Sequence, residues 1–218
     1  MALPVDRFAV LRRAALLSLV LPLAMGAAGA LAERPKHDFE AQGVREGERV
    51  PDLTVYTANG APLRLSQLWA DRPLLLLTGS VTCHVSRREL PRAEPIVARF
   101  GDRISAALLY VIEPHPWDDP SPYLVDGREW FPVANWIDGV FRRQPLTLDE
   151  RAGYAEELIA HIGLPLPTLV DGMDNRAWRM LGGGANMALL IRDGMVVEKQ
   201  GWFEPEAMQR AIERLLSH

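Results

Sequence analysis

Two kinds of apolar pattern alternate along residues 50–218. Short apolar runs bounded by glycine, proline or asparagine predict strands, and the runs over 74–77 and 105–112 are almost entirely apolar, as in strands buried on both faces. Apolar residues three and four positions apart predict helices. The predicted strands cover 53–56, 63–65, 73–78, 105–112, 167–170, 187–191 and 195–198. A short helix is predicted to begin near Ser66, and three longer helices are predicted over 86–100, 148–162 and 205–216.

This order of elements predicts an α/β fold with a thioredoxin-like mixed sheet flanked by helices. Asn59-Gly60 and Asp193-Gly194 are hairpin turn signals and predict antiparallel pairs. The segment 113–145 is dense in proline and tryptophan and too long for a simple loop. We therefore expect it to be an insertion between a central strand and the following helix.

The first 32 residues form a separate unit. Arg12 and Arg13 precede an apolar run that ends in Ala30-Leu31-Ala32, the small-x-small pattern of a signal-peptidase site. We predict a signal peptide over 1–32, with an exported protein in the periplasm or outside the cell. A retained membrane anchor is the alternative, and the route, general or twin-arginine, stays open. Residues 33–49 are polar and predict a linker, followed by one domain over 50–218.

Composition narrows the class of protein. The chain is 48% hydrophobic and 24% charged, which is typical of a globular domain. The formal net charge is -4 and the basic residues are scattered, which excludes a nucleic-acid-binding surface. Cys83 is the one cysteine. A lone thiol in an exported protein is buried and inert, linked to another chain, or reactive.

The position of Cys83 favours a reactive thiol. It follows the strand over 73–78 and begins a helix, where backbone N–H groups and the helix dipole stabilise a thiolate, and Arg87 and Arg88 add positive charge one turn later. The alternative is a small side chain packed in the core. Since no second cysteine exists, an oxidised Cys83 must be reduced by an external thiol, and no cofactor is expected.

Glu113 and His115 follow the strand over 105–112. If this strand lies beside 73–78, both side chains emerge at the same edge of the sheet as Cys83, where a histidine can move a proton and a carboxylate can orient it. The alternative is that they only satisfy loop backbone groups. A metal site is not expected, because Cys83, His84 and His115 show no known ligand spacing.

Pro167 precedes the predicted strand over 167–170. In a thioredoxin-like sheet, a proline at such a position is usually cis and faces the reactive cysteine, so we expect Pro167 to support substrate binding. An ordinary trans proline at the start of an edge strand is the alternative.

Four stretches of the chain resemble one family. The run TGSVTC ending at Cys83 resembles the reactive turn GS-x-T-[Sec/Cys] of iodothyronine deiodinases, and YVIEPHPWD (110–118) resembles their Y-I-E-E-A-H-P-x-D stretch. LPTLVDGMDN (166–175) and the hairpin beginning MALLIRDG are similar to the family's later strands. The similarity covers the chain from about residue 50 onward.

This resemblance implies a function and a set of site residues. Cys83 would remove iodine from an aryl ring and be restored by a thiol reductant or a thioredoxin-like protein. Glu113 and His115 match the family's acidic and histidine residues, and Ser80, Thr82 and Tyr110 match supporting positions. A homodimer is implied by the resemblance alone.

Two other functions stay open. In a single-cysteine peroxidase, Cys83 would attack peroxide and form a sulfenic acid. Ser80 lies three residues before Cys83, as in peroxiredoxins, but Leu76 stands where they have a proline. The third hypothesis is a binding module with a structural thiol.

Overall fold

One mixed sheet organises the part of the chain that the computed structural model describes, residues 37–123 and 131–217. The strand order is β2-β1-β5-β4-β3-β6-β7. The central strands β3, β4 and β5 are parallel, whereas β1 and β6 run antiparallel to them. The strands are β1 (Thr54–Thr57), β2 (Pro62–Arg64), β3 (Leu74–Gly79), β4 (Ser105–Tyr110), β5 (Thr168–Val170), β6 (Ala188–Arg192) and β7 (Met195–Gln200).

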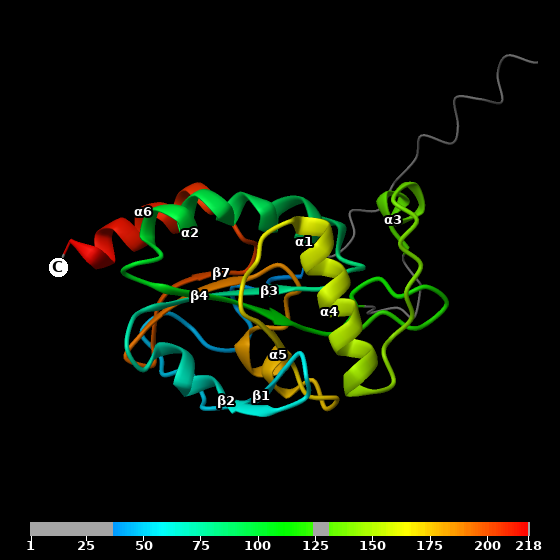
Figure 1. Ribbon diagram of the computed structural model, residues 1–218, viewed down its shortest axis with the longest axis horizontal. Helices are drawn as coiled ribbons and strands as arrows, with labels where there is room; N and C mark the ends of the chain where they lie inside the picture. The colour runs from blue at the N-terminus through cyan, green and yellow to red at the C-terminus, as the bar shows by residue number, and fades with distance from the viewer. Residues whose placement is uncertain (1–36, 124–130, 218) are drawn as a thin grey trace, which may run out of the picture. The chain divides into compact units, whose positions relative to one another are not determined.

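Helices cover both faces of this sheet. Figure 1 shows α2 and α6 side by side over one face, where Arg99 and Glu213 form an ion pair of 3.0 Å. The helices of the described residues are η1 (Leu65–Trp69), α1 (His84–Glu89), η2 (Leu90–Ala93), α2 (Glu94–Phe100), α3 (Val133–Ile137), α4 (Leu148–Ile162), α5 (Arg176–Leu181) and α6 (Pro205–Leu216), of which η1 and η2 are 3-10 helices.

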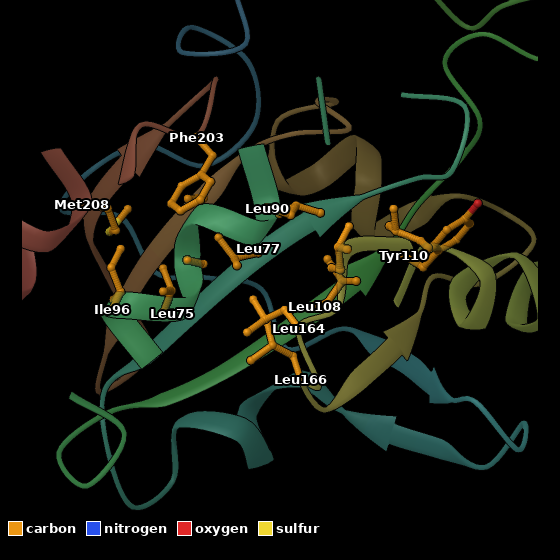
Figure 2. Close-up of a cluster of buried hydrophobic side chains, with 14 of the residues drawn as sticks. Leu75, Leu77, Leu90, Ile96, Leu108, Tyr110, Leu164, Leu166, Phe203 and Met208 are labelled. Atoms are coloured by element: carbon orange, nitrogen blue, oxygen red, sulfur yellow. The ribbon is translucent and has the colours of Figure 1, made fainter. Parts of the chain in front are cut away.

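The leucine run of β3 lies at the centre of the sheet. Leu75 and Leu77 pack into a cluster with residues of α2, α4 and α6 (Figure 2), whereas Leu74 and Leu76 pack into a second cluster with residues of α5 and β1. All four side chains are fully buried. Because successive strand residues point to opposite faces, the predicted burial on both faces is confirmed. The mixed α/β sheet expected from the sequence is confirmed with it.

The helix predicted over 86–100 is not continuous. It begins at His84 and changes to the 3-10 helix η2 between α1 and α2. Pro91 and Pro95 lie in this stretch, and neither has an N–H to donate to the preceding turn. The predicted helices over 148–162 and 205–216 are confirmed as α4 and α6, whereas α5 was not predicted.

Residues 37–49 are not a linker. Phe39 and Val44 are buried, and the Val44 N–H donates to the Met180 carbonyl at 3.1 Å. Gly43 lies so close to the backbone of Gly182 that any side chain at position 43 would clash. The domain therefore begins by His37, earlier than the expected boundary at residue 50, because these apolar side chains complete the core.

The predicted signal peptide or anchor over 1–32 lies outside the described residues, as do residues 33–36. Within residues 37–123 and 131–217, none of the helices has the length and apolar character needed to cross a membrane.

Candidate active site

Cys83 closes the turn between β3 and α1. Its N–H donates to the Ser80 carbonyl at 3.2 Å, and its Sγ accepts a hydrogen bond of 3.4 Å from the N–H of Ser86, so Cys83 is the N-cap of the helix. Because β3 is buried on both faces, the turn that follows it is held in place. The cysteine lies at the helix start, as the sequence predicted.

Burial controls the ionisation of Cys83. Its side chain is 3% exposed, and burial raises the pKa of the thiol, while the Ser86 hydrogen bonds and the charge of Arg87 lower it less. Arg88 forms a surface ion pair with Glu89. The expected stabilisation of a thiolate is therefore outweighed by loss of water, since a charged sulfur is costly in an apolar cluster. A reaction at Cys83 needs a base to take the thiol proton.

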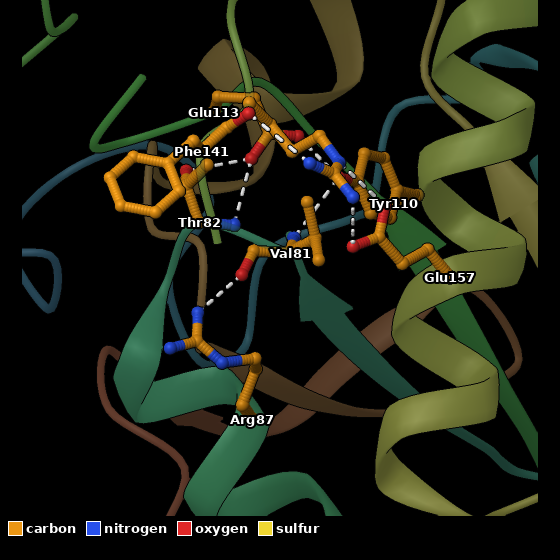
Figure 3. A network of polar contacts seen from close by, with 8 residues as sticks. Val81, Thr82, Arg87, Tyr110, Glu113, Phe141 and Glu157 are labelled. Carbon is orange, nitrogen blue, oxygen red and sulfur yellow. Dashed lines mark hydrogen bonds and ion pairs between the residues drawn. The ribbon is translucent and has the colours of Figure 1, made fainter. Parts of the chain in front are cut away.

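Glu113 holds the same turn from the other side. Its Oε2 accepts hydrogen bonds from the Thr82 N–H at 2.9 Å and the Thr82 Oγ1 at 2.7 Å, and its Oε1 accepts one from the Tyr110 hydroxyl. The Tyr110 oxygen in turn accepts the N–H of Val81 at 3.0 Å. Figure 3 shows this network between the ends of β3 and β4. The prediction that Glu113 emerges beside the cysteine turn is confirmed.

The Glu113 carboxyl is fully buried. Burial raises its pKa, and the hydrogen bonds from Tyr110 and Thr82 lower it less. With no exposed surface, the carboxyl acts on a substrate only through the residues that it holds. We therefore describe Glu113 as a positioning residue of the turn.

His115 lies against the turn that carries Cys83. The backbone N–H of His115 donates to Thr82 Oγ1 at 3.3 Å. Thr82 directly precedes Cys83, so this bond holds the His115 backbone against the cysteine turn. The His115 side chain is 6% exposed, and its ring centroid lies 6.0 Å from that of His84. The structure thus brings His115, Thr82 and Cys83 together at one edge of the sheet.

Ser80 belongs to the turn and Pro167 does not lie near it. Ser80 is fully buried, and its Oγ has no hydrogen-bond partner within the described residues. Pro167 precedes β5 and lines a hollow with Leu74 and Ser105, which begin β3 and β4. Cys83 follows the opposite end of β3. No described peptide bond is cis, so Pro167 is trans, and its expected position facing the cysteine is wrong.

The segment entering β6 takes the place expected for Pro167. β6 is the antiparallel neighbour of β3. Met187 and Thr78 exchange hydrogen bonds there, and the Ser86 hydroxyl donates to the Ala185 carbonyl. No proline stands in this segment, so the sequence offered no signal for it.

Tyr123 is a further residue, one that the sequence did not indicate, beside the segment that leads into β6. Its hydroxyl donates to the Gly183 carbonyl at 2.7 Å and accepts the Trp178 Nε1–H at 3.3 Å. Burial raises the pKa of Tyr123, and a negative charge on Cys83 would raise it further.

Arg87 and Asn135 bind the insertion to the cysteine turn. Arg87 is buried and donates to the Val81 carbonyl, to Asn135 Oδ1 at 3.0 Å and to Asp138 Oδ2 at 2.7 Å. Asn135 donates from Nδ2 to the Thr82 carbonyl at 2.9 Å. The start of α1, the turn and α3 are thereby joined.

The insertion also carries an aromatic cluster. Trp117 makes edge-to-face contacts with Phe131, Trp136 and Phe141, with ring centroids 5.0 to 5.5 Å apart. Trp117 and Trp136 are 37% and 58% exposed. Trp117 is two residues from His115, so an apolar aromatic surface lies beside the candidate site.

The described residues contain no group of three or more histidine, cysteine, aspartate or glutamate side chains arranged to hold a metal ion.

A mixed sheet of this order, with a thiol at the start of the helix that follows a central strand, defines a thioredoxin-like fold with a single cysteine. Solved structures agree on the fold. A protein disulfide isomerase candidate from Bacteroides thetaiotaomicron has a TM-score of 0.52 at 20% identity, covering 80% of this chain and 92% of that one. A thiol:disulfide interchange protein from Bacteroides sp. has a TM-score of 0.52 at 13% identity, with the same coverage of 80% and 92%. An uncharacterized conserved protein from Geobacillus kaustophilus gives 0.53 at 11%, covering 79% and 82%.

Among curated proteins, the chain is similar to the type II iodothyronine deiodinase of Fundulus heteroclitus. The two are 32% identical over 110 residues, which is 50% of this chain and 38% of the deiodinase. The match therefore spans well under half of the relative's length. No family model matches the chain.

Proposed function

We propose that this protein is a thiol-dependent oxidoreductase that removes iodine from an aryl ring, with Cys83 as the nucleophile. The observation that supports it is the assembly of Cys83, Thr82, His115 and the buried Glu113 at one edge of a thioredoxin-like sheet. The similarity to a deiodinase supports the choice of a carbon–iodine bond over other electrophiles.

The residues divide the reaction among them. His115 takes the proton of the Cys83 thiol, and the sulfur attacks the iodine atom. The carbon–iodine bond breaks with its electron pair on the ring carbon, which receives the proton from His115. The products are the dehalogenated ring and a Cys83 sulfenyl iodide. A first thiol then displaces iodide to form a mixed disulfide, and a second thiol releases Cys83 as a thiol and leaves as the external disulfide.

The aromatic cluster supports an aryl substrate. Edge and face contacts between rings stabilise an aromatic ligand beyond its area burial. Trp117 and Phe141 lie in the insertion that Asn135 ties to the Thr82 carbonyl, so a ring bound there lies near the cysteine turn.

Peroxide reduction at Cys83 is the alternative that uses the same sulfur and the same reductant. We propose as well that the protein is exported to an oxidising compartment and that it forms a homodimer. A periplasmic or extracellular location would leave Cys83 dependent on whichever thiols that compartment supplies.

The test makes three measurements on one preparation of the protein: iodide release, peroxide loss and labelling of the thiol. Full-length protein is incubated with an iodinated phenol and dithiothreitol, or with hydrogen peroxide and dithiothreitol, and iodide release and peroxide loss are followed. Iodide release that Cys83→Ser abolishes is the expected result. Because Cys83 is the only cysteine, iodoacetamide labelling followed by mass spectrometry reports the reactivity of that thiol directly.

Peroxide turnover without iodide release would replace the proposal by the peroxidase. A thiol that resists labelling in the folded protein would contradict both enzyme hypotheses and leave the binding module. His115→Gln tests whether His115 moves the proton. It should reduce turnover by about 100-fold, because a general acid or base usually contributes at least that much to the rate.

A further inference from the structure

A groove of about 510 Å³ lies on the side of α1 that faces α6. Its lining comes from α1 and η2, from the segment entering β6, from the connection between β7 and α6, and from the first turns of α6. The residues that the argument uses are Val85, Arg88, Asn186, Trp202, Phe203 and Arg210. This size suits a ligand of a few residues.

Asn186 is an unusual residue in this lining. Its side chain is 1% exposed, and neither Oδ1 nor Nδ2 has a hydrogen-bond partner among the described residues. Its backbone is satisfied, because its carbonyl accepts the N–H of Phe203 at 2.8 Å. A buried amide with both groups unpaired is rare. Since an amide side chain offers one acceptor and two donors, its complement is another amide, such as a peptide group.

Three arginines and three glutamates line the groove, and of these Arg210 and Glu204 form no ion pair with the described residues. Arg88 pairs with Glu89, and Arg92 pairs with Glu89 and Glu206. Arg210 lines the same groove and forms no ion pair with the described residues. A guanidinium in this position can bind a carboxylate through two parallel hydrogen bonds.

The groove borders the cysteine turn. Val85 lies two residues after Cys83, and the Ser86 hydroxyl donates to the carbonyl of Ala185, the neighbour of Asn186. The two walls are therefore joined at the first turn of the helix that Cys83 caps. A ligand held in the groove therefore lies beside the helix that has Cys83 as its N-cap.

We propose that this groove binds the external reductant and that the reductant is a small peptide thiol with a free carboxylate. Its peptide group pairs with Asn186 and its carboxylate with Arg210. This inference rests on the proposed function and specifies its second half. The thiol sulfur attacks the oxidised Cys83 sulfur, the Cys83–iodine bond breaks, and iodide leaves as the mixed disulfide forms. A second molecule of peptide thiol attacks that disulfide, releasing the oxidised peptide dimer and the Cys83 thiol.

The test compares two reductants. Glutathione is a peptide thiol with carboxylates, whereas dithiothreitol has neither a peptide group nor a charge. Asn186→Leu and Arg210→Ala should each lower the ratio of glutathione-supported to dithiothreitol-supported turnover by about tenfold. Arg99→Ala is the matched control, because Arg99 is an exposed arginine of α2 outside the groove. A variant that merely folds poorly would lose turnover with both reductants and leave the ratio unchanged.

A binding measurement does not depend on turnover. S-Methylglutathione should bind to the Cys83→Ser protein in calorimetry, and Asn186→Leu in the same background should weaken it about tenfold. Equal ratios in all variants, no binding of S-methylglutathione, or reduction by thioredoxin but not by glutathione would each overturn the proposal. Failure of the dehalogenation itself would appear as absent turnover with dithiothreitol, and the calorimetry would still test the groove.

Discussion

Single side chains around Cys83 show how burial sets the chemistry. The same loss of water raises the pKa of the Cys83 thiol and of the Glu113 carboxyl. Both shifts disfavour the charged form of the group, because burial removes the water that stabilises a charge. A nucleophile in such a site becomes reactive when a neighbouring base removes its proton, which is the role that we propose for His115.

Glu113→Gln should change how stability depends on pH. Since burial raises the pKa of Glu113 in the folded protein, its contribution to the free energy of unfolding is complete below the unfolded pKa, about 4.3, and is lost as pH rises through the folded value. Gln does not titrate. In urea unfolding between pH 4 and pH 8, the stability of the wild type relative to Glu113→Gln should fall as pH rises.

Glu113→Ala is the contrasting variant. It leaves the Thr82 N–H, the Thr82 hydroxyl and the Tyr110 hydroxyl without their acceptor, which should cost about 3 kcal/mol at any pH. A stability difference between wild type and Glu113→Gln that stays constant with pH would show that this carboxyl does not titrate in the folded protein as its burial implies.

Among the elements, the short helices depend on side chains that bind them to their neighbours. α3 has five residues, too few for stability by itself. Its place is fixed by Asn135 and Asp138, both of which accept from Arg87. The sequence predicted an insertion here but gave no means of recognising that a charged residue of α1 would be buried to hold it.

Arg87→Met should destabilise the protein by about 2 to 3 kcal/mol, because it removes charge-assisted hydrogen bonds to Val81, Asn135 and Asp138 in a buried site. Arg88→Met is the matched control. The Arg88 side chain is 67% exposed and pairs with Glu89 at the surface, so its loss should cost less than 1 kcal/mol. Thermal and urea unfolding measure both, and equal losses would contradict the role of Arg87.

The helices and strands also show which elements the sequence pattern can predict. Long amphipathic helices and the leucine run of β3 were predicted well, because burial imposes a clear period on them. The six residues of α5 are too few to show such a period. The position of Pro167 was misjudged because a local motif does not reveal which strand lies antiparallel to β3, and that pairing depends on contacts far apart in the chain.

For the whole molecule, the start of the folded domain is the clearest difference from the sequence prediction. Polar composition over 33–49 suggested a linker, yet two apolar residues among the charged ones are enough to anchor the segment. Besides burying Phe39 and Val44, the segment supplies the backbone carbonyls of Glu40 and Gln42 as acceptors for the amine of the buried Lys199.

A chain that begins at Val50 should therefore be less stable than one that begins at His37. Removal of Phe39 and Val44 exposes the core that they cover, and each side chain contributes about 1.5 to 3 kcal/mol when fully buried. The measurement is the urea midpoint of the two truncated chains beside the full-length protein. Equal midpoints for the two truncations would mean that residues 37–49 do not stabilise the domain.

Thr82 gives the hydrogen-bond chain at the turn a fixed direction. The N–H of His115 can only donate, so Thr82 Oγ1 must accept from it and must point its own hydrogen at Glu113. The direction of these two hydrogen bonds cannot reverse, because a backbone amide does not give up its hydrogen under physiological conditions. Protons consequently cannot travel from Glu113 to His115 by this route. In the proposed reaction, the buried carboxyl therefore holds the geometry of the turn and passes no proton to His115 through Thr82.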